Sequence, residues 1–140
     1  MHPRRERPQT GAAAVEFALV AMLLLTILVA IIQFSIYFWA YQVGAHAANE
    51  GARRYAVDPC NTGANNALVV SRVGSAAAGA TGVSHSFGQG IGNTGGLEPG
   101  DTVTVTVTFT APSIGGPLPS LPTITKTATA RVEDVPSGCV

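Results

Sequence analysis

The chain opens with a long apolar run and continues with shorter segments in which apolar and polar residues alternate. Within Ala12–Ala40, residues 17–39 carry no charge, fourteen of them are Leu, Ile, Val or Phe, and Gln33 is the most polar. As a helix, residues 17–39 would be about 34 Å long, enough for a hydrocarbon core of about 30 Å. Because lipid offers the backbone no hydrogen-bond partners, the run predicts a single transmembrane helix.

The helical pattern continues beyond the apolar run. No proline occurs before Pro59, and the residue before a proline disfavours helix, so we expect one transmembrane and extended helix over residues 12–58. Small residues recur along it at every fourth position: Ala40, Gly44, Ala48 and Ala52. This spacing permits close packing against a second helix, and it is also what an alanine-rich helix shows by chance. Tyr37, Trp39 and Tyr41 lie where an interfacial aromatic belt would be.

Residues 59–140 predict a small extracytoplasmic domain of the α+β class. Helical spacing indicates a second helix over residues 64–80, capped by Asn61 or Thr62 and ended by Gly79 or Gly82. Residues 83–88 are expected as a short strand. Apolar and polar residues then alternate over residues 102–110 and 123–135, which predicts two strands. In the first of them, Val103, Val105, Val107 and Phe109 lie on one face. We therefore expect one helix and an antiparallel sheet of about three strands, with the apolar strand faces buried under the second helix.

Composition narrows the function classes. Charged residues make up 11% of the chain and the formal net charge is zero, which argues against nucleic acid as a partner. The two cysteines, Cys60 and Cys139, form no metal-binding pattern, so we expect no metal and no cofactor. Outside the cytoplasm they would form a disulfide, and the alternative is two buried free thiols.

Candidate catalytic chemistry is weak. His2, His46 and His85 occupy leader, helix and loop contexts, and no nucleophile–base grouping accompanies them. The glycine-rich segment QGIGNTGG lacks the lysine–serine end of a phosphate-binding loop, and Glu98 and Asp101 bracket a turn where we expect them to be solvated. The sequence therefore favours a protein that is not an enzyme.

The start of the chain carries its most specific pattern. A leader over residues 1–11 contains Arg4, Arg5 and Arg7, which favours a cytoplasmic N-terminus, and Glu16 is the fifth residue after Gly11. This arrangement resembles the class III signal of type IV pilin-like proteins. The resemblance narrows to the TadE-like family, pseudopilins of the tight-adherence (Flp) pilus system. It rests on two groups of residues, Gly11, Ala14, Glu16, Phe17, Ala18, Leu19 and Val20, then Glu50, Gly51, Ala52 and Arg53.

The family resemblance implies a structural role in assembling the pilus, and with it cell adhesion. A prepilin peptidase would cut between Gly11 and Ala12, and Glu16 would pair with the terminal amine of a neighbouring subunit. The implied partners are the membrane, that peptidase, other pilin and pseudopilin subunits, and the pilus assembly platform. The implied location is the bacterial inner membrane. Two residues depart from the pattern: Ala12 replaces the bulky first residue of many pilins, and Phe17 stands where major Flp pilins have tyrosine.

Two alternatives remain at the level of sequence. Ala45-His46-Ala47 fits a signal-peptidase site, although the apolar run is longer than the about 7–15 residues of a secretory signal. The second alternative is a single-pass membrane-anchored binding or adhesion module whose leader is never cleaved. The mature N-terminus distinguishes these from a processed pilin-like chain.

Overall fold

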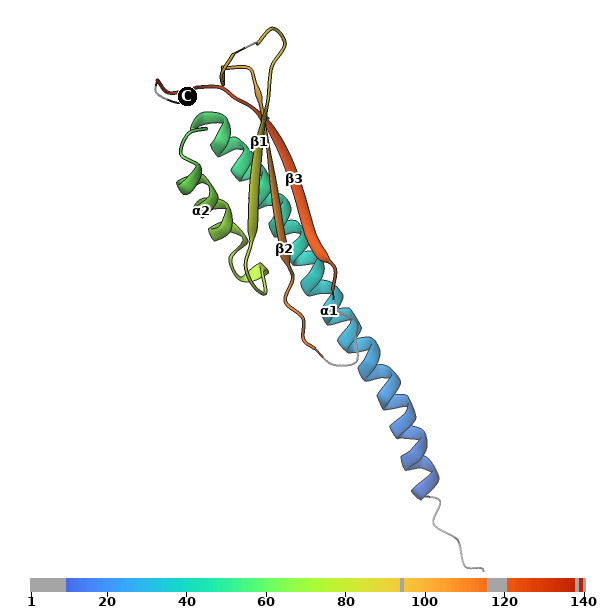
Figure 1. Cartoon of the computed structure of the whole chain (residues 1–140). Coiled ribbons are helices and arrows are strands. Elements are labelled where there is room, and N and C mark those ends of the chain that lie inside the picture. Colours follow the sequence, from blue (N-terminus) through green and yellow to red (C-terminus); the bar gives the residue numbers. More distant parts are fainter. Residues whose placement is uncertain (1–9, 94, 116–120, 138, 140) are drawn as a thin grey trace, which may run out of the picture. The chain divides into compact units, whose positions relative to one another are not determined.

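The computed structural model describes residues 10–93, 95–115, 121–137 and 139. Its elements are the helices α1 (Thr10–Val57) and α2 (Thr62–Val73), the 3₁₀ turn η1 (Gly74–Ala76), and the strands β1 (Gly82–Gly88), β2 (Thr102–Thr110) and β3 (Thr123–Arg131) (Figure 1). The chain divides into two compact units between Phe34 and Ser35, so α1 contributes to both. The predicted α+β class, with one long helix, a short helix and a three-stranded antiparallel sheet, is confirmed.

The end of α1 follows directly from the sequence. The helix stops at Val57, one residue before Asp58-Pro59, because a proline disfavours helical geometry in the residue that precedes it. The N–H of Asp58 still donates to the carbonyl of Arg54 (2.9 Å), so the last turn is closed by a hydrogen bond. The predicted end at residue 58 is therefore right to within one residue.

Helix α2 is shorter than the predicted segment 64–80. Asn61 is its N-cap, and the Asn61 side-chain oxygen accepts from the N–H of Ala64 (3.4 Å). The helix ends at Gly74, which has a φ of +46° that glycine adopts without steric cost. The expected ends at Gly79 and Gly82 were wrong, because Gly74 already breaks the helix and Ala78 donates to the carbonyl of Thr110 (2.8 Å).

The sheet has the order β1-β2-β3, with both pairs antiparallel. Val105 at its centre pairs with His85 on β1 and with Ala128 on β3. The valine face of β2 is buried and its threonine face is exposed or half-buried, as the alternation predicts. On the threonine face, hydroxyls form cross-strand pairs between Thr104 and Thr129 (3.3 Å) and between Thr106 and Thr127 (3.2 Å).

Strand β3 ends at Arg131, four residues before the predicted end. The N–H of Val132 still donates to the backbone carbonyl of Asp101, next to β2 (2.7 Å). The next N–H, that of Glu133, instead donates to the carbonyl of Ala56 at the end of α1 (2.8 Å). The tail after β3 therefore crosses the C-terminal end of α1 instead of extending the sheet.

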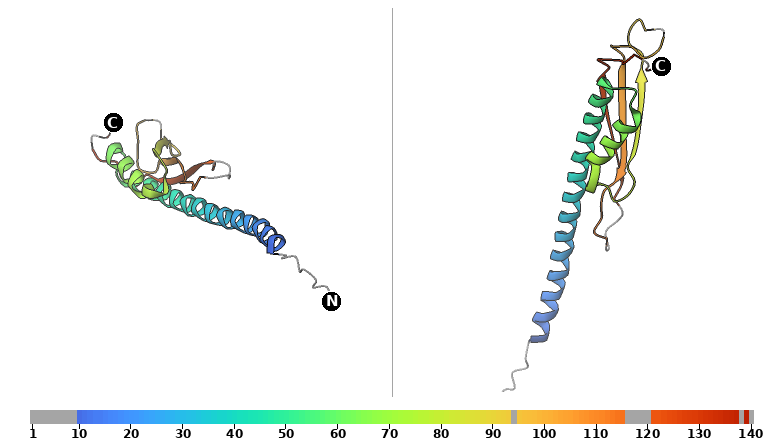
Figure 2. Two further views of the ribbon diagram at one scale, coloured as in Figure 1. Left: turned by 90° about the horizontal axis from the view of Figure 1, so that it is seen from below. Right: turned by 90° about the vertical axis from the view of Figure 1, so that its left-hand side faces the viewer.

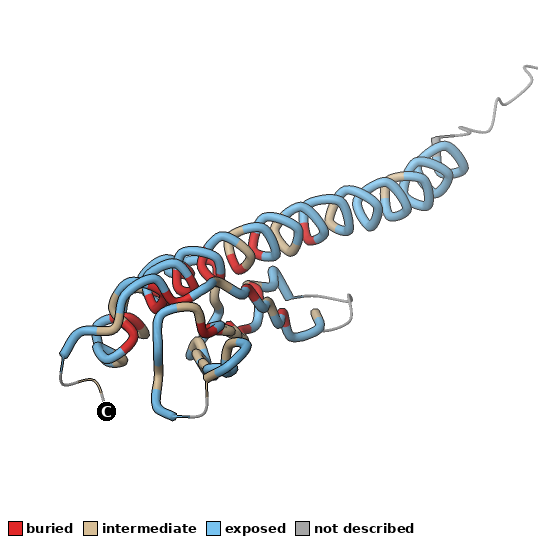
Figure 3. Tube along the Cα trace, turned by 90° about the horizontal axis from the view of Figure 1, so that it is seen from above, coloured by how far each residue is buried: buried red, intermediate tan, exposed pale blue. Residues whose placement is uncertain are grey.

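The core of the second unit lies between the sheet and two helices, not under α2 alone as the sequence suggested. Both α2 and the C-terminal part of α1 lie along the sheet (Figure 2). A Cβ added at Gly51 on α1 would meet Val69 of α2 and Val105 of β2, so all three elements meet at this glycine. Most buried positions of α1 fall within residues 40–57 (Figure 3).

Candidate functional site

The first helical turns hold the residues of the predicted processing site. Gly11 and Ala12 lie in the first turn of α1, because the helix already begins at Thr10, and Glu16 follows about one turn later. Both Gly11 and Glu16 are exposed, and open space surrounds the position where Gly11 would carry a Cβ. The remainder of the predicted leader, including Arg4, Arg5 and Arg7, lies outside the described residues.

The apolar part of α1 has the properties of a membrane span. In the described part of the chain, one helix, Gly11–Val57, is long and apolar enough to cross a membrane, and its most apolar 18-residue window has a mean hydropathy of 2.8 with none of it buried. Within the run, the hydroxyl of Thr26 donates to the carbonyl of Met22 (2.8 Å). This local bond gives the Thr26 hydroxyl a hydrogen-bond partner within its own helix, which lipid could not provide.

Aromatic side chains follow the apolar run at the start of the second unit. The rings of Tyr37 and Tyr41 lie 6.5 Å apart, and Trp39 is about half exposed. The ammonium group of Lys126, on β3, lies 2.9 Å from the centre of the Tyr41 ring, which is a cation–π contact. Lys126 interrupts the apolar face of β3, and this contact gives its charge a partner on α1.

The small-residue stripe of α1 packs against the sheet of its own chain. Ala40, Ala48 and Ala52 are at most 1% exposed, and Gly44 is buried. A Cβ at Gly44 would lie 2.7 Å from Cε1 of Phe109 on β2 and 3.3 Å from Cγ of Lys126. The sequence left open whether this stripe serves packing against a second helix or arises by chance. Within this chain, the stripe lets α1 approach the sheet closely at Gly44.

The last turns of α1 carry an aromatic cluster that the sequence did not reveal. The Tyr55 ring stacks on His85 of β1, with ring centres 4.4 Å apart and planes inclined by 23°, and the Phe87 ring lies edge-on to both. The Tyr55 hydroxyl donates to Oδ1 of Asn66 on α2 (2.8 Å). Burial raises the pKa of the Tyr55 hydroxyl, so the folded state favours its neutral form. His85 thus lies in the strand expected over residues 83–88, and not in the loop context considered when candidate catalytic residues were weighed, and its ring packs on tyrosine.

The loop between β1 and β2 is organised around one carboxylate. Asp101 is 3% exposed, and its oxygens accept hydrogen bonds from the Asn93 side-chain amide (2.9 and 3.0 Å), the N–H of Glu98 (3.0 Å) and the N–H of Gly90 (2.6 Å). The expectation that Asp101 is solvated was therefore wrong. The Asn93 amide, followed by the N–H groups of Glu98 and Gly90, holds the pKa of Asp101 below its usual value.

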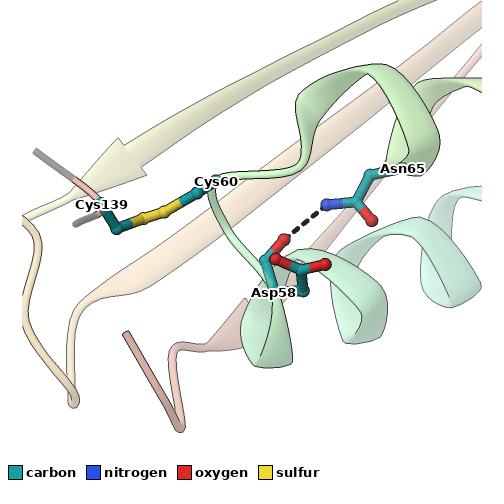
Figure 4. The surroundings of a disulfide bond; sticks show 4 residues. All are labelled: Asp58, Cys60, Asn65 and Cys139. Carbon is teal, nitrogen blue, oxygen red and sulfur yellow. Dashed lines mark hydrogen bonds between the residues drawn. A yellow bond between two sulfur atoms is a disulfide. The ribbon is translucent and has the colours of Figure 1, made fainter. Parts of the chain in front are cut away.

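A disulfide lies beside the end of α1 (Figure 4). Cys60 and Cys139 are joined through their sulfur atoms, and their Cα atoms are 5.6 Å apart, within the usual range for a disulfide. Next to it, the Asn65 side-chain amide donates to the carbonyl of Asp58 (2.6 Å), which ties α2 to the residues that follow α1. The two cysteines are 79 positions apart in the sequence, so the bond links the start of the domain to its tail.

Within residues 10–93, 95–115, 121–137 and 139, no three His, Cys, Asp or Glu side chains gather closely enough to hold a metal ion. His46 lies on the exposed side of α1, one turn from Glu50, and Glu50 is 3.9 Å from Arg72 of α2.

Comparison with known protein families gives a match over the N-terminal helix. The family model described as TadE-like protein matches residues 11–53, which include Gly11, Glu16 and Gly51. No curated protein and no solved structure gives a significant match to the chain. The matched range covers the apolar run and most of the packed part of α1. The N-terminal helix of this chain is therefore similar to the TadE-like protein family over residues 11–53.

Proposed function

We propose that this chain is a minor pilin, or pseudopilin, that takes part in assembling a tight-adherence (Flp-type) pilus. The match of residues 11–53 to the TadE-like family suggests a role in assembly of this pilus, and that family is not known for enzymes. The observation that carries the proposal is the coincidence of the family match with an exposed apolar helix that begins at Thr10 and carries Glu16 near its start.

The proposed chain has three parts with separate tasks. Residues 1–11 are a leader removed by prepilin peptidase between Gly11 and Ala12. Residues 12–58 anchor the chain in the bacterial inner membrane with a cytoplasmic N-terminus and extend into the domain. Residues 59–140 complete an extracytoplasmic domain, stapled by Cys60 and Cys139, that meets other pilin subunits and the assembly platform.

Charge pairing by Glu16 supplies the proposed register between subunits. A charged carboxylate on a helix near the bilayer centre costs about 2.5–3.5 kcal/mol, so a nearby positive group would strongly stabilise the Glu16 carboxylate there. Cleavage after Gly11 creates a terminal amine at Ala12, and a neighbouring subunit can present that amine to Glu16. In low dielectric such a pair offsets much of the cost of removing each charge from water.

The test is the mature N-terminus. The full chain is coexpressed with a prepilin peptidase, and mass spectrometry is applied to the protein recovered from membranes. We expect a chain that begins at Ala12, and we expect Gly11→Leu to leave the full-length precursor. As a control, Ala13→Leu should be processed normally, because it lies beyond the scissile bond. Recovery of the wild-type chain with Met1 attached would contradict the proposal and favour an anchored binding module with an uncleaved leader.

A further inference from the structure

The boundary between the two compact units falls inside the apolar run of α1. The second unit begins at Ser35, whereas the run continues to Trp39, so residues 35–39 belong both to the run and to the second unit. A helix that enters a hydrocarbon core of about 30 Å at Phe17 leaves it about 20 residues later, and a headgroup layer of about 5–7 Å then extends to roughly Tyr41. With α1 spanning the membrane as proposed, this end of the second unit lies in the headgroup layer.

Strand β2 runs towards this end of the second unit, antiparallel to α1. A Cβ added at Gly51 would meet Val105 of β2, and a Cβ added at Gly44, about two turns earlier in α1, would meet Phe109. The described part of the β2–β3 connection that follows β2, residues 111–115, continues past the end of the sheet (Figure 1). The connection therefore leaves the sheet on the side where the second unit contains the end of the apolar run.

The connection is long enough to reach the hydrocarbon core. From Phe109 to Ile114, extended backbone rises by up to about 16 Å, at about 3.3 Å per residue. From Gly44 back to Ser35, α1 covers about 14 Å, at about 1.5 Å per residue. Because Phe109 lies at the level of Gly44, this length brings Ile114 to about the level of Ser35, where α1 leaves the core.

The side chains at this end of the second unit suit lipid better than water. No Asp, Glu, Lys or Arg occurs between Glu16 and Glu50, and none occurs in residues 111–125. Ile114 and Trp39 are about half exposed, at 53% and 48%. Uncharged segments with exposed aliphatic and aromatic side chains next to a membrane span are typical of chain that lies in the membrane interface.

The first charge after the connection marks the outer limit of this apolar surface. The ammonium group of Lys126 lies 2.9 Å from the centre of the Tyr41 ring, and Cγ of Lys126 lies 3.3 Å from a Cβ added at Gly44. A lysine at a membrane surface lays its aliphatic stem along apolar groups and keeps its ammonium among the headgroups, where lipid phosphates are its counter-ions. The position of Lys126 beside Tyr41 fits the outer edge of the headgroup layer.

We propose that residues 111–115 lie in the membrane interface at the depth of Trp39, with the Ile114 side chain at the boundary of the acyl chains. Lipid is the partner that the structure supports, because α1 runs unbroken from the apolar run into the unit that carries this connection. The proposal rests on the membrane span of the proposed function, but it requires neither leader cleavage nor a pilus. The domain is then held to the membrane at two points, α1 and the connection.

The experiment measures the depth of position 114 in the full chain, reconstituted in phosphatidylcholine vesicles. Trp39 is the one tryptophan of the sequence, so its emission reports on α1, and combining Trp39→Phe with Ile114→Trp moves the probe to the connection. Lipid brominated near the carbonyl end of its acyl chains should quench the emission from both positions about twofold. The matched control combines Trp39→Phe with Ile91→Trp. Ile91 is fully exposed in the β1–β2 loop, at the other end of the sheet, so its position should keep nearly all its emission.

A second measurement uses the unchanged chain, because a tryptophan itself prefers the membrane interface. The vesicles contain a phosphatidylcholine with a photoreactive diazirine in its acyl chain, and mass spectrometry of chymotryptic peptides locates the lipid adducts after irradiation. Adducts are expected on the apolar run and on residues 111–115, and not on the β1–β2 loop. Ile114→Asn should reduce the adducts on the connection severalfold and leave those on the apolar run unchanged.

The outcomes separate this proposal from the proposed function. The proposal is overturned if position 114 is quenched no more than position 91, or if lipid adducts form on α1 alone. Emission from position 114 that is shifted to the blue but not quenched by brominated lipid would show a protein contact there, which also overturns it. Absence of quenching at Trp39 would overturn both the membrane span and this proposal, whereas a retained leader would contradict the proposed processing alone.

Discussion

Replacing Gly51 with alanine tests how α1 is packed in the second unit. An alanine in the interior of an exposed helix is more favourable than glycine by about 0.8–1.0 kcal/mol. At Gly51 the new Cβ would lie 2.6 Å from Cγ2 of Val69 and 3.2 Å from Cγ1 of Val105. Carbon atoms pack best at about 3.5–4.0 Å, so the methyl group would overlap Val69 by roughly 1 Å.

The surroundings of Gly51 cannot adapt easily to this overlap. Val69 and Val105 are both fully buried, and β-branched side chains have few alternative rotamers. Overpacking of a well-filled core costs about 1–3 kcal/mol, and we expect the upper half of that range here. After the gain in helix propensity is subtracted, Gly51→Ala should lower the free energy of unfolding by about 1–2 kcal/mol.

The measurement is thermal unfolding of the disulfide-bonded full chain in detergent micelles. Near-ultraviolet circular dichroism follows the stacked rings of Tyr55 and His85, which report on the domain and not on helix content. A change of 1 kcal/mol shifts Tm by about 4–8 °C in a domain of this size, so a loss of roughly 5–15 °C is expected.

Gly63→Ala is the matched control for this experiment. Gly63 lies in the first turn of α2, and nothing lies within 4 Å of its added Cβ. This variant should keep or raise Tm, because only the helix-propensity gain remains. If Gly51→Ala raised Tm as Gly63→Ala does, the close meeting of α1, α2 and β2 at Gly51 would be refuted.

Three further predictions concern the same domain. Mass spectrometry of the unreduced exported protein should show Cys60 linked to Cys139, and Cys60→Ser should lower the free energy of unfolding by about 4 kcal/mol; free thiols in exported protein would contradict the staple. Ala48→Leu should destabilise the domain by about 1–3 kcal/mol, since Ala48 is 1% exposed against the chain's own core, and an unchanged urea midpoint would disprove that packing. Because the pKa of Asp101 is lowered in the folded state, its ionised carboxylate stabilises the fold above about pH 4, and this stabilisation is lost as the pH falls through the folded-state pKa. The difference in urea midpoint between wild type and Asp101→Asn should therefore shrink from about pH 7 towards about pH 2. A difference that stays constant with pH would contradict a stabilising Asp101 carboxylate.

The sequence predicted the elements well because each has a strong local signal. An apolar run longer than a bilayer is thick, a proline after α1, and the uninterrupted alternation of β2 require no tertiary information. The end of α2 was missed because three glycines could each stop a helix, and only the bond from Ala78 to Thr110 in the folded chain selects the first.

The packing could not be predicted, because small residues at every fourth position fit a helix and a sheet equally well. Ala40, Gly44, Ala48 and Ala52 show the same spacing in either case, and the contact of Gly44 with Phe109 depends on a strand about 65 residues later in the chain. The cage around Asp101 was missed for a similar reason. Its donors come from three separate loop residues, and their convergence requires the loop to close first.

The pairing of the earliest helix with the latest strand constrains how the protein can mature. Lys126 of β3 contacts the ring of Tyr41 on α1, and Glu133 beyond β3 bonds to Ala56, so the packing around this part of α1 is complete only after β3 has been added. Contacts between such distant parts of a chain form slowly. If the domain is exported as we propose, translocation of nearly the whole polypeptide must precede folding, and the helix must remain unaggregated at the membrane until the sheet is complete.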